Sequence, residues 1–288
     1  MEIPNIYFPN LGLSFHLSSE AFSIFGISVY WYGIIITSGI ILGTLLACYI
    51  AKKENLDPNL FMDFVLYDIL FAILGARLYF VIFNWDYYKA NPTQILNIRQ
   101  GGLAIYGGVI ASVIGAFVYT RIKKIRFLHF ADVAIYGLIL GQAIGRYGNF
   151  FNKEAFGGYT DNLFAMAILK NEAKPPISAD VLNHVKTFEA FGNAEYIQVH
   201  PTFLYESCWN ILLLIILLVY RKHRKAYGEI FCLYLIGYGL GRFWVEGLRT
   251  DQLLLWHTQI PVSQVVAVIS VIMGIIGIVF CRKRYTVK

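Results

Sequence analysis

Seven long, continuous apolar stretches constrain what this chain can fold into. Each is about 20 residues long, the length that an α-helix needs to cross roughly 30 Å of hydrocarbon. Strands of a membrane β-barrel would instead alternate apolar and polar residues over about ten positions. Of all residues, 57% are hydrophobic and only 15% are charged, which excludes an ordinary soluble domain. The pattern predicts an all-α, polytopic membrane protein with seven transmembrane helices, near residues 22–50, 60–83, 102–120, 130–149, 201–220, 228–247 and 260–280.

Basic residues indicate the orientation of these helices. The clusters Lys52-Lys53, 121–126, 221–225 and 282–284 all fall on the same side of a seven-span arrangement. Because short cytoplasmic loops carry the excess of Lys and Arg, we expect the amino terminus outside and the carboxy terminus in the cytoplasm. The clusters would face anionic membrane lipids, so the net charge of +6 requires no nucleic acid partner. The first apolar run is long and lacks a basic segment before it, so we expect no cleaved signal peptide.

One segment outside the membrane is long enough to fold. We expect residues 151–199 to form a small extracytoplasmic cap, inserted between the fourth and fifth transmembrane helices of a single integral membrane domain, 1–288. Within this segment, SADVLNHVKTFEAFG runs from Ser178 to Gly192. A serine at its start and a glycine at its end predict a capped amphipathic helix.

Several common chemistries lack the residues they require. The cysteines lie in separate predicted helices without CxxC spacing, so we expect neither a disulfide framework nor a zinc site. The sequence contains no HExxH, GxSxG or P-loop motif, which argues against a metalloprotease, a serine hydrolase or an NTPase. The four cysteines are Cys48, Cys208, Cys232 and Cys281.

Polar and aromatic residues recur at one depth in the predicted helices. Counting 1.5 Å of helical rise per residue from each inner boundary places them roughly 20 to 30 Å towards the outer surface. Guanidinium groups bind phosphate bidentately, and a phospholipid is the phosphate-bearing molecule at that depth. The pattern predicts a phospholipid headgroup site that opens to the outer leaflet. The residues at this depth are Tyr32, Arg77, Tyr106, Arg146 and Arg242.

A structural interpretation of these arginines remains open at this point. An arginine near the outer surface can extend its guanidinium to water, and depth alone does not require a function. Arg242 and Glu246 stand at i and i+4, a spacing that is also typical of a purely structural ion pair. Arg77 is interpreted as a structural or gating charge. Three arginines directed at one layer, beside the run GRYGNFFNKEAFGG at 145–158, favour a binding site.

The same residues resemble a known family. GRYGNFFNKEAFG contains every fixed position of GRxGNFxNxExxG, the signature of the bacterial prolipoprotein diacylglyceryl transferases. The family's other motifs occur in its order over roughly residues 30 to 251. They are WYG at 31–33, GARL at 75–78, QGGLAIYGG at 100–108, HPTFLYE at 200–206 and GYGLGRFWVEGLRTD at 237–251.

The resemblance implies a reaction and its partners. The diacylglyceryl group of phosphatidylglycerol would pass to the lipobox cysteine thiol in the signal peptide of a preprolipoprotein, forming a thioether and releasing glycerol phosphate. No cofactor is needed, because the phosphodiester already activates the lipid. We expect a monomer in the bacterial cell membrane, with its active site facing the outer leaflet. A phospholipid transporter without covalent chemistry is the alternative, but we see neither a repeat nor a site near the midplane, which such proteins commonly show.

The resemblance also implies which residues form the site. Arg146 and Arg242 would bind the lipid phosphate and stabilise the charge that develops on it. Glu154 and Glu246 would orient the arginines or handle protons, because an ionised carboxylate cannot contact phosphate favourably. The substrate-binding set would be Tyr32, Gln100, Gly101, Gly102, Asn149, Asn152, Gly157 and Tyr238.

Tyr106 departs from the family pattern, and the general base is therefore open. Many members have histidine at this position, where it is an attractive base for the thiol. Tyrosine has a pKa near 10 and is a poor base from its neutral form, so we expect Tyr106 to donate a hydrogen bond to the substrate. His200, at the outer start of the fifth helix, is the next candidate base. Its other interpretation, as a residue packed under the cap, is the favoured one.

Overall fold

The structure is a computed structural model that describes residues 3–98, 101–255 and 258–285. The chain packs as two compact units. The first unit comprises residues 1–43 and 135–288, and the second comprises residues 44–134.

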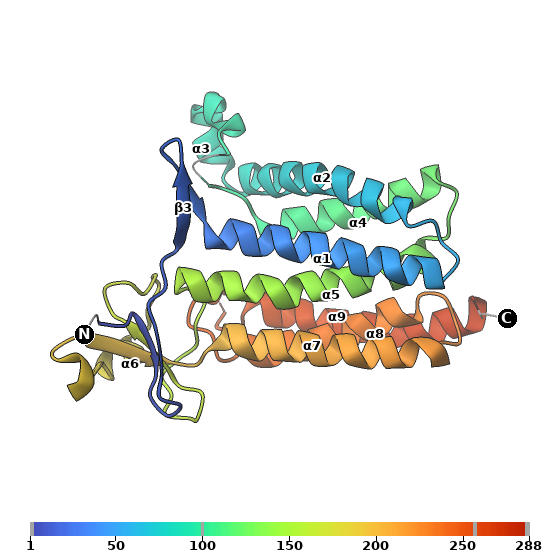
Figure 1. Ribbon diagram of the computed structural model, residues 1–288. Helices are drawn as coiled ribbons and strands as arrows, with labels where there is room; N and C mark the ends of the chain where they lie inside the picture. Colours follow the sequence, from blue (N-terminus) through green and yellow to red (C-terminus); the bar gives the residue numbers. More distant parts are fainter. Residues whose placement is uncertain (1–2, 99–100, 256–257, 286–288) are drawn as a thin grey trace. The chain divides into compact units, whose positions relative to one another are not determined.

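Each of the seven predicted apolar stretches contains a long helix (Figure 1). The first helix begins later than predicted, at Trp31 instead of residue 22, because residues 20–30 form a β-hairpin that leads directly into it. The hairpin turns at Phe25 and Gly26, which both have positive φ, 50° and 77°. The helices are α1 (Trp31–Lys53), α2 (Asn59–Phe83), α4 (Ile105–Ile122), α5 (Phe127–Asn152), α7 (Thr202–Tyr220), α8 (Glu229–Glu246) and α9 (Val262–Arg284).

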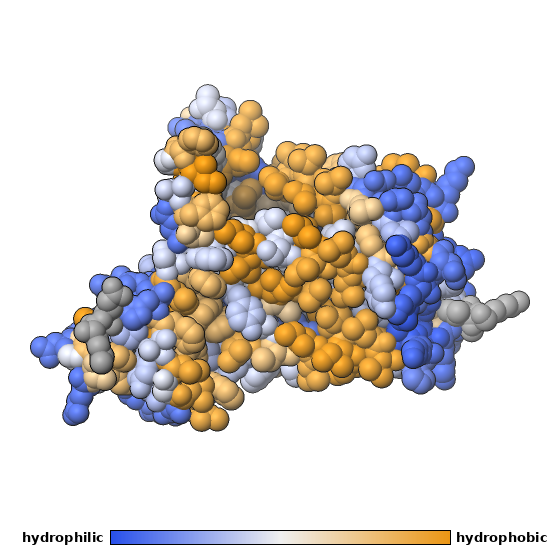
Figure 2. Space-filling view, in the orientation of Figure 1, coloured by the Kyte–Doolittle hydropathy of each residue, from blue (hydrophilic) through white to orange (hydrophobic). Residues whose placement is uncertain are grey.

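In the described part of the chain, six helices are long and apolar enough to cross a membrane: α1, α2, α4, α5, α7 with the short turn that follows it, and α9. The helix outside this group, α8, carries Glu229, Arg242 and Glu246 within 18 residues. Many large apolar side chains on the six helices are exposed, as lipid contact requires. Figure 2 shows hydrophobic residues along the helices of the face in view and hydrophilic residues gathered at helix ends.

The second unit is built around a close pair of helices, α2 and α4. A Cβ atom on Gly75 would lie 2.7 Å from the carbonyl oxygen of Gly107, and one on Gly107 would lie 2.4 Å from that of Gly75. Only glycine allows the two backbones to come this close. In the sequence, α2 is followed by α3 (Trp85–Ala90) and the 3₁₀ helix η1 (Pro92–Leu96) before α4 begins.

Helix pairs in the first unit also meet at small residues. A Cβ atom on Gly43 of α1 would lie 2.5 Å from the carbonyl oxygen of Gly137 on α5. On α9, a Cβ atom on Gly274 would lie 2.6 Å from the carbonyl oxygen of Cys232 on α8. Helices α7 and α8 are joined by a hydrogen bond from Trp209 Nε1 to the carbonyl oxygen of Gly237, at 2.9 Å. These contacts hold the helices that carry the candidate site.

The prediction of an all-α fold is too narrow, because the first unit also contains two sheets. A five-stranded antiparallel sheet has the order β2-β1-β5-β7-β6, and β3 and β4 form the hairpin before α1. The hydrophobic core beside the five-stranded sheet contains Ile6, Ile168, Ile197 and Val199, all fully buried. The strands are β1 (Ile6–Phe8), β2 (Leu13–Phe15), β3 (Glu20–Ile24), β4 (Ile27–Tyr30), β5 (Met166–Leu169), β6 (Lys186–Thr187) and β7 (Glu195–Val199).

The long amphipathic helix predicted from Ser178 to Gly192 is wrong. Ser178 does cap a helix, and its hydroxyl accepts from the backbone N–H of Val181 at 3.4 Å, but this helix, α6, spans only Ala179–Asn183. The chain then pairs as β6, makes the short 3₁₀ helix η2 (Glu189–Phe191) and turns at Gly192, with φ of 67°. Strand pairing with β7 outweighs local helix propensity here.

Candidate active site

The motif that follows Arg146 folds back on itself where α5 ends. Asn149 and Asn152 both donate to Oε1 of Glu154, at 3.2 and 3.1 Å. Lys153 and Ala155, on either side of Glu154, have positive φ of 52° and 57°. Such conformations cost about 1–3 kcal/mol each for residues other than glycine and are typical of functional sites. The backbone is thus shaped to present Glu154 to the two asparagines.

Gly157 joins three segments. Its N–H donates to the carbonyl of His200 at 3.0 Å, and Gly158 N–H donates to the carbonyl of Leu248 at 2.9 Å. A Cβ atom on Gly157 would lie 2.7 Å from Cβ of His200 and 2.8 Å from the carbonyl oxygen of Leu248. The position therefore requires glycine for close packing. It connects the motif at the end of α5 (residues 145–158, here called the α5 motif) to the start of α7 and to the start of the segment after α8.

Three arginines converge on one buried carboxylate, Glu206 of α7. Arg146 Nη2 lies 2.6 Å from Glu206 Oε2, and Arg242 Nη1 lies 3.3 Å from each carboxylate oxygen. Arg249 Nη1 is 3.7 Å from Glu206 Oε1. The Glu206 side chain is only 6% exposed. A carboxylate buried at this level requires positive partners, and the three guanidinium groups provide them.

Two further carboxylates complete this arginine cluster, which we define as Arg146, Arg242, Arg249 and their carboxylate partners. Arg242 Nη2 lies 2.5 Å from Glu246 Oε2, so the pair at i and i+4 forms as the spacing predicts. Arg249 holds Asp251 through two parallel hydrogen bonds of 2.9 and 2.6 Å. Three guanidinium groups and three carboxylates therefore balance in charge.

Arg249 and Asp251 of this cluster shift each other's pKa. Burial alone would lower the pKa of the Arg249 guanidinium, but the hydrogen bonds and charge of Asp251 and the nearby Glu206 and Glu246 raise it. Burial would raise the pKa of Asp251, yet the hydrogen bonds and charge of Arg249 hold it below its ordinary value. Both groups are therefore charged at neutral pH.

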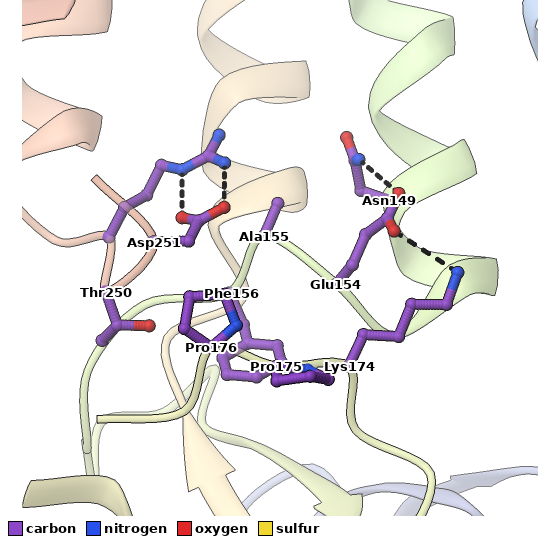
Figure 3. Close-up of a pocket in the computed structure, with 10 residues that line it drawn as sticks. Asn149, Glu154, Ala155, Phe156, Lys174, Pro175, Pro176, Thr250 and Asp251 are labelled. Carbon is purple, nitrogen blue, oxygen red and sulfur yellow. Dashed lines mark hydrogen bonds and ion pairs between the residues drawn. The ribbon is translucent and has the colours of Figure 1, made fainter. Parts of the chain in front are cut away.

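A polar cavity of about 300 Å³ adjoins this cluster (Figure 3). Asp251 lines it on one side, and Asn149, Glu154 and Lys174 line it on the other. Arg249, the hydrogen-bond partner of Asp251, also lines the cavity. The remaining lining residues are Ala155, Phe156, Pro175, Pro176 and Thr250. The cavity thus lies between the α5 motif and the segment after α8, and it offers charged and neutral hydrogen-bonding groups.

A larger groove of about 730 Å³ runs along the first turns of α1. Its wall is mainly apolar, with Val29, Tyr30 and Ile34, and Asn152 and Lys174 supply polar groups. Tyr32 also lines this groove and packs against the α5 motif, since a Cβ atom on Gly148 would lie 2.8 Å from its ring. The groove therefore combines an apolar wall with polar groups, as an amphiphilic ligand requires.

The structure brings most predicted site residues into the first unit. Arg146, Arg242 and Glu246 meet in the arginine cluster. Among the residues that the structure describes, Glu154 pairs with Asn149, Asn152 and Lys174 and not with an arginine. Tyr238 lies on α8, where its ring stacks on that of Tyr234 with centroids 5.4 Å apart.

The remaining predicted residues lie in the second unit or outside the described ranges. Gly101 and Gly102, which precede α4, and Tyr106, its second residue, belong to the second unit. Gln100 lies outside the described residues.

Arg77 is a structural arginine within the second unit. Its guanidinium donates five hydrogen bonds of 2.6 to 3.0 Å to main-chain carbonyls. All five N–H donors of an arginine are thereby used. The structural interpretation of this residue fits better than phosphate binding. The acceptors are the carbonyls of Gln94, Ile95, Asn97, Gly101 and Gly102.

His200 is tied to its surroundings by both backbone and ring. Its N–H donates to the carbonyl of Gly158 at 3.0 Å, and Nδ1 lies 3.3 Å from the hydroxyl of Tyr205 and 3.4 Å from Nδ2 of Asn162. Burial lowers the pKa of its ring. These contacts favour the interpretation of His200 as a packing residue.

Sequence reasoning missed Glu206, Arg249, Asp251 and Lys174. The first three lie inside the motifs HPTFLYE and GYGLGRFWVEGLRTD. A charge within a run of otherwise apolar helical residues, as at Glu206, is a signal that could have identified it. No local pattern indicates Lys174, because the fold alone brings it to Glu154.

Comparisons with known proteins agree with these observations. A family model described as prolipoprotein diacylglyceryl transferase matches residues 19–280. A protein of Clostridium novyi is 47% identical over 266 residues, which cover 91% of this chain and 95% of that relative. Relatives from Clostridioides difficile and Finegoldia magna are 40% and 44% identical, over 92% and 89% of this chain and 95% and 92% of their own lengths. All three are named phosphatidylglycerol–prolipoprotein diacylglyceryl transferase.

Proposed function

Because this chain belongs to the prolipoprotein diacylglyceryl transferase family, we infer that it transfers the diacylglyceryl group of phosphatidylglycerol to the lipobox cysteine of a prolipoprotein. The thiol sulfur forms a bond to the glycerol carbon of the diacylglyceryl group as the C–O bond to phosphate breaks. A thioether forms, glycerol phosphate leaves, and the thiol proton passes to a base or to the departing phosphate. The reaction is an alkyl transfer that needs no cofactor.

The convergence of Arg146, Arg242 and Arg249 on Glu206 is the observation that carries this proposal. The leaving phosphate gains negative charge as the C–O bond breaks, and preorganised cations at that point lower the barrier. Arg146 is best placed to act on the lipid. In the described part of the chain its one carboxylate partner is Glu206, held through Nη2, which leaves its other N–H donors for phosphate oxygens. Arg242 is held on both sides by Glu206 and Glu246 and would supply charge and shape.

We assign the carboxylates and amides to positioning. Glu206 and Glu246 orient the guanidinium groups, and Glu154 holds Asn149 and Asn152 so that their remaining polar atoms reach the glycerol hydroxyls or the phosphate. Tyr32 and Tyr238 act as hydrogen-bond donors to the substrate. The family resemblance also assigns Tyr106, Gln100, Gly101 and Gly102 to substrate binding.

We further propose a seven-span topology in which α8 is the additional transmembrane helix. Its charged residues are consistent with this, because Glu246 and Arg242 pair with each other within the protein. The amino terminus is outside, the carboxy terminus is cytoplasmic, and residues 151–199 form a cap over an active site that faces the outer leaflet. The enzyme acts as a monomer on phosphatidylglycerol and on prolipoproteins.

The direct test uses purified protein in detergent, phosphatidylglycerol labelled in its non-acylated glycerol, and a lipobox peptide. We expect release of water-soluble glycerol phosphate that depends on the peptide thiol and is lost in Arg146→Ala and Arg242→Ala. A peptide with serine in place of the cysteine is the control. Lipid binding without release, by folded protein with competent substrates, would contradict the proposal and favour a transporter.

A further inference from the structure

Lys174 connects the polar cavity and the apolar groove. It lines both, and its backbone N–H donates to the carbonyl of Lys153 at 3.0 Å, which fixes the main chain of the cap beside the end of α5. Its ammonium group lies 3.4 Å from Oε2 of Glu154. A single cation of the cap thus stands at the junction of a polar space and an apolar one.

The ammonium group of Lys174 is held weakly and can exchange partners. Its side chain is 47% exposed, and an ion pair of this length and exposure contributes only about 0–1 kcal/mol. Lys153, by contrast, is 5% exposed and fixed by Glu172 and the carbonyl of Leu17, each at 2.9 Å. Lys153 is therefore structural, whereas Lys174 is free to turn from Glu154 to an anion in either space.

A second group in the cavity lacks a partner. The hydroxyl oxygen of Thr250 is buried, and no residue in the described ranges makes a hydrogen bond to it. A buried hydroxyl without a partner is costly and is usually satisfied by water or a ligand. The opposite charges of the cavity wall are balanced, because Arg249 faces Asp251 and Lys174 faces Glu154. The cavity therefore suits a small polyol with one phosphate better than a large anion.

From these observations we propose that the cavity binds the glycerol phosphate portion of the lipid, with Lys174 contacting the phosphate and Thr250 a glycerol hydroxyl. The proposal rests on the proposed function, which supplies this chemistry both as the lipid headgroup and as the released product. Arg249 and Asn149 connect the cavity to the arginine cluster. Arg249 reaches Glu206, and Asn149 lies three residues along α5 from Arg146. The volume of about 300 Å³ is at the lower end for small-molecule sites.

Direct binding to the purified protein in detergent tests the proposal without requiring turnover. Calorimetry would measure dissociation constants for two probes, glycerol phosphate and inorganic phosphate. Lys174→Met should weaken both by about 3- to 10-fold, since it removes one partly exposed charge-assisted contact. Thr250→Val should weaken glycerol phosphate by about 3- to 10-fold and leave inorganic phosphate unchanged, since it removes one neutral hydrogen bond.

Lys170→Met is the matched control. Lys170 is another lysine of the cap, 41% exposed, and pairs with Glu195 at 2.6 Å. It does not line either space. Dissociation constants for Lys174→Met within about twofold of those for Lys170→Met would overturn the phosphate contact. Equal weakening of both probes by Thr250→Val would overturn the hydroxyl contact.

Kinetics then distinguish the two sources of glycerol phosphate. A raised KM for phosphatidylglycerol in Lys174→Met places the contact already in the lipid complex, whereas weakened product binding with an unchanged KM places it after cleavage. Both results support the site. A protein that binds glycerol phosphate as described but never releases it from lipid would contradict the proposed function and leave the cavity assignment standing.

Discussion

Glu206 should be the carboxylate on which the arginine cluster depends most. Glu206→Gln keeps the shape of the side chain and removes its charge. Arg242 and Arg249 would each retain one acidic partner, Glu246 and Asp251, but Arg146 would lose its carboxylate partner. The main loss is therefore one buried ion pair with a 2.6 Å contact.

The size of the effect follows from this geometry. Removing one member of a buried pair costs about 3–5 kcal/mol. The glutamine carbonyl can still accept one hydrogen bond, which recovers about 1 kcal/mol. We expect the free energy of unfolding to fall by about 2–4 kcal/mol, or roughly 5–10 °C in melting temperature. We expect kcat to fall about 100- to 1,000-fold, as when one preorganised donor to a developing anion is lost.

Thermal melting in detergent and glycerol phosphate release measure the two effects. Glu195→Gln is the control, since Glu195, the first residue of β7, is 55% exposed and pairs with Lys170, which directly follows β5. An ion pair this exposed contributes at most about 1 kcal/mol. Glu206→Asp keeps the charge and should recover part of both losses. If Glu206→Gln melted and turned over like Glu195→Gln, the reasoning that Glu206 organises the arginines would be refuted.

Three further predictions concern single residues. Gly157→Ala should lower the free energy of unfolding by about 1–3 kcal/mol, because the new Cβ atom would meet His200 and the Leu248 carbonyl. Gly158→Ala is the control and should change stability little, because a Cβ atom there would meet nothing within 4 Å. Melting curves of the two variants check this. Tyr106→Phe should lower activity without abolishing it and leave the acidic limb of the pH–rate profile in place; total loss with a shifted profile would contradict its role as a hydrogen-bond donor. His200 has a folded-state pKa below its ordinary 6.5, so the unfolded chain binds the proton first as the pH falls, and the folded protein should lose stability below about pH 6.5. His200→Gln should remove this part of the pH dependence of the melting temperature. An unchanged pH dependence in this variant would show that His200 does not cause it.

The sequence predicted the helices well because membrane spans are long and apolar, and their signal extends over about 20 residues. It failed for the strands. Strands β1, β2 and β6 contain two or three residues each, and β1 pairs with β5, about 160 residues away in the sequence. Because the hairpin β3–β4 is also apolar, the predicted first helix wrongly included most of it. A local pattern cannot distinguish an apolar hairpin from the first turns of an apolar helix.

The candidate site was predictable where one segment carries it and unpredictable where the fold assembles it. Arg146, Asn149, Asn152 and Glu154 share one motif, and the i, i+4 pair of Arg242 and Glu246 follows from helical spacing. Within the described ranges the partners of Glu154 are two amides and a lysine and not arginines, and the lysine comes from a distant segment that the motif does not reveal. Glu206 depends on contacts between three segments, which no spacing within α7 reveals.

The balance of charge in the arginine cluster bears on the missing histidine at Tyr106. Without lipid, three guanidinium groups and three carboxylates cancel, so the cluster holds its cations close together without repulsion. A phosphodiester adds one negative charge, and the cluster then has one more anion than cations. Nearby negative charge favours the uptake of a proton. The thiol releases one proton in the reaction, and the departing phosphate, which gains a negative charge as its C–O bond breaks, can accept it. We therefore expect a tyrosine at position 106 to be compatible with the chemistry, because the leaving group can take the proton that a histidine would otherwise take.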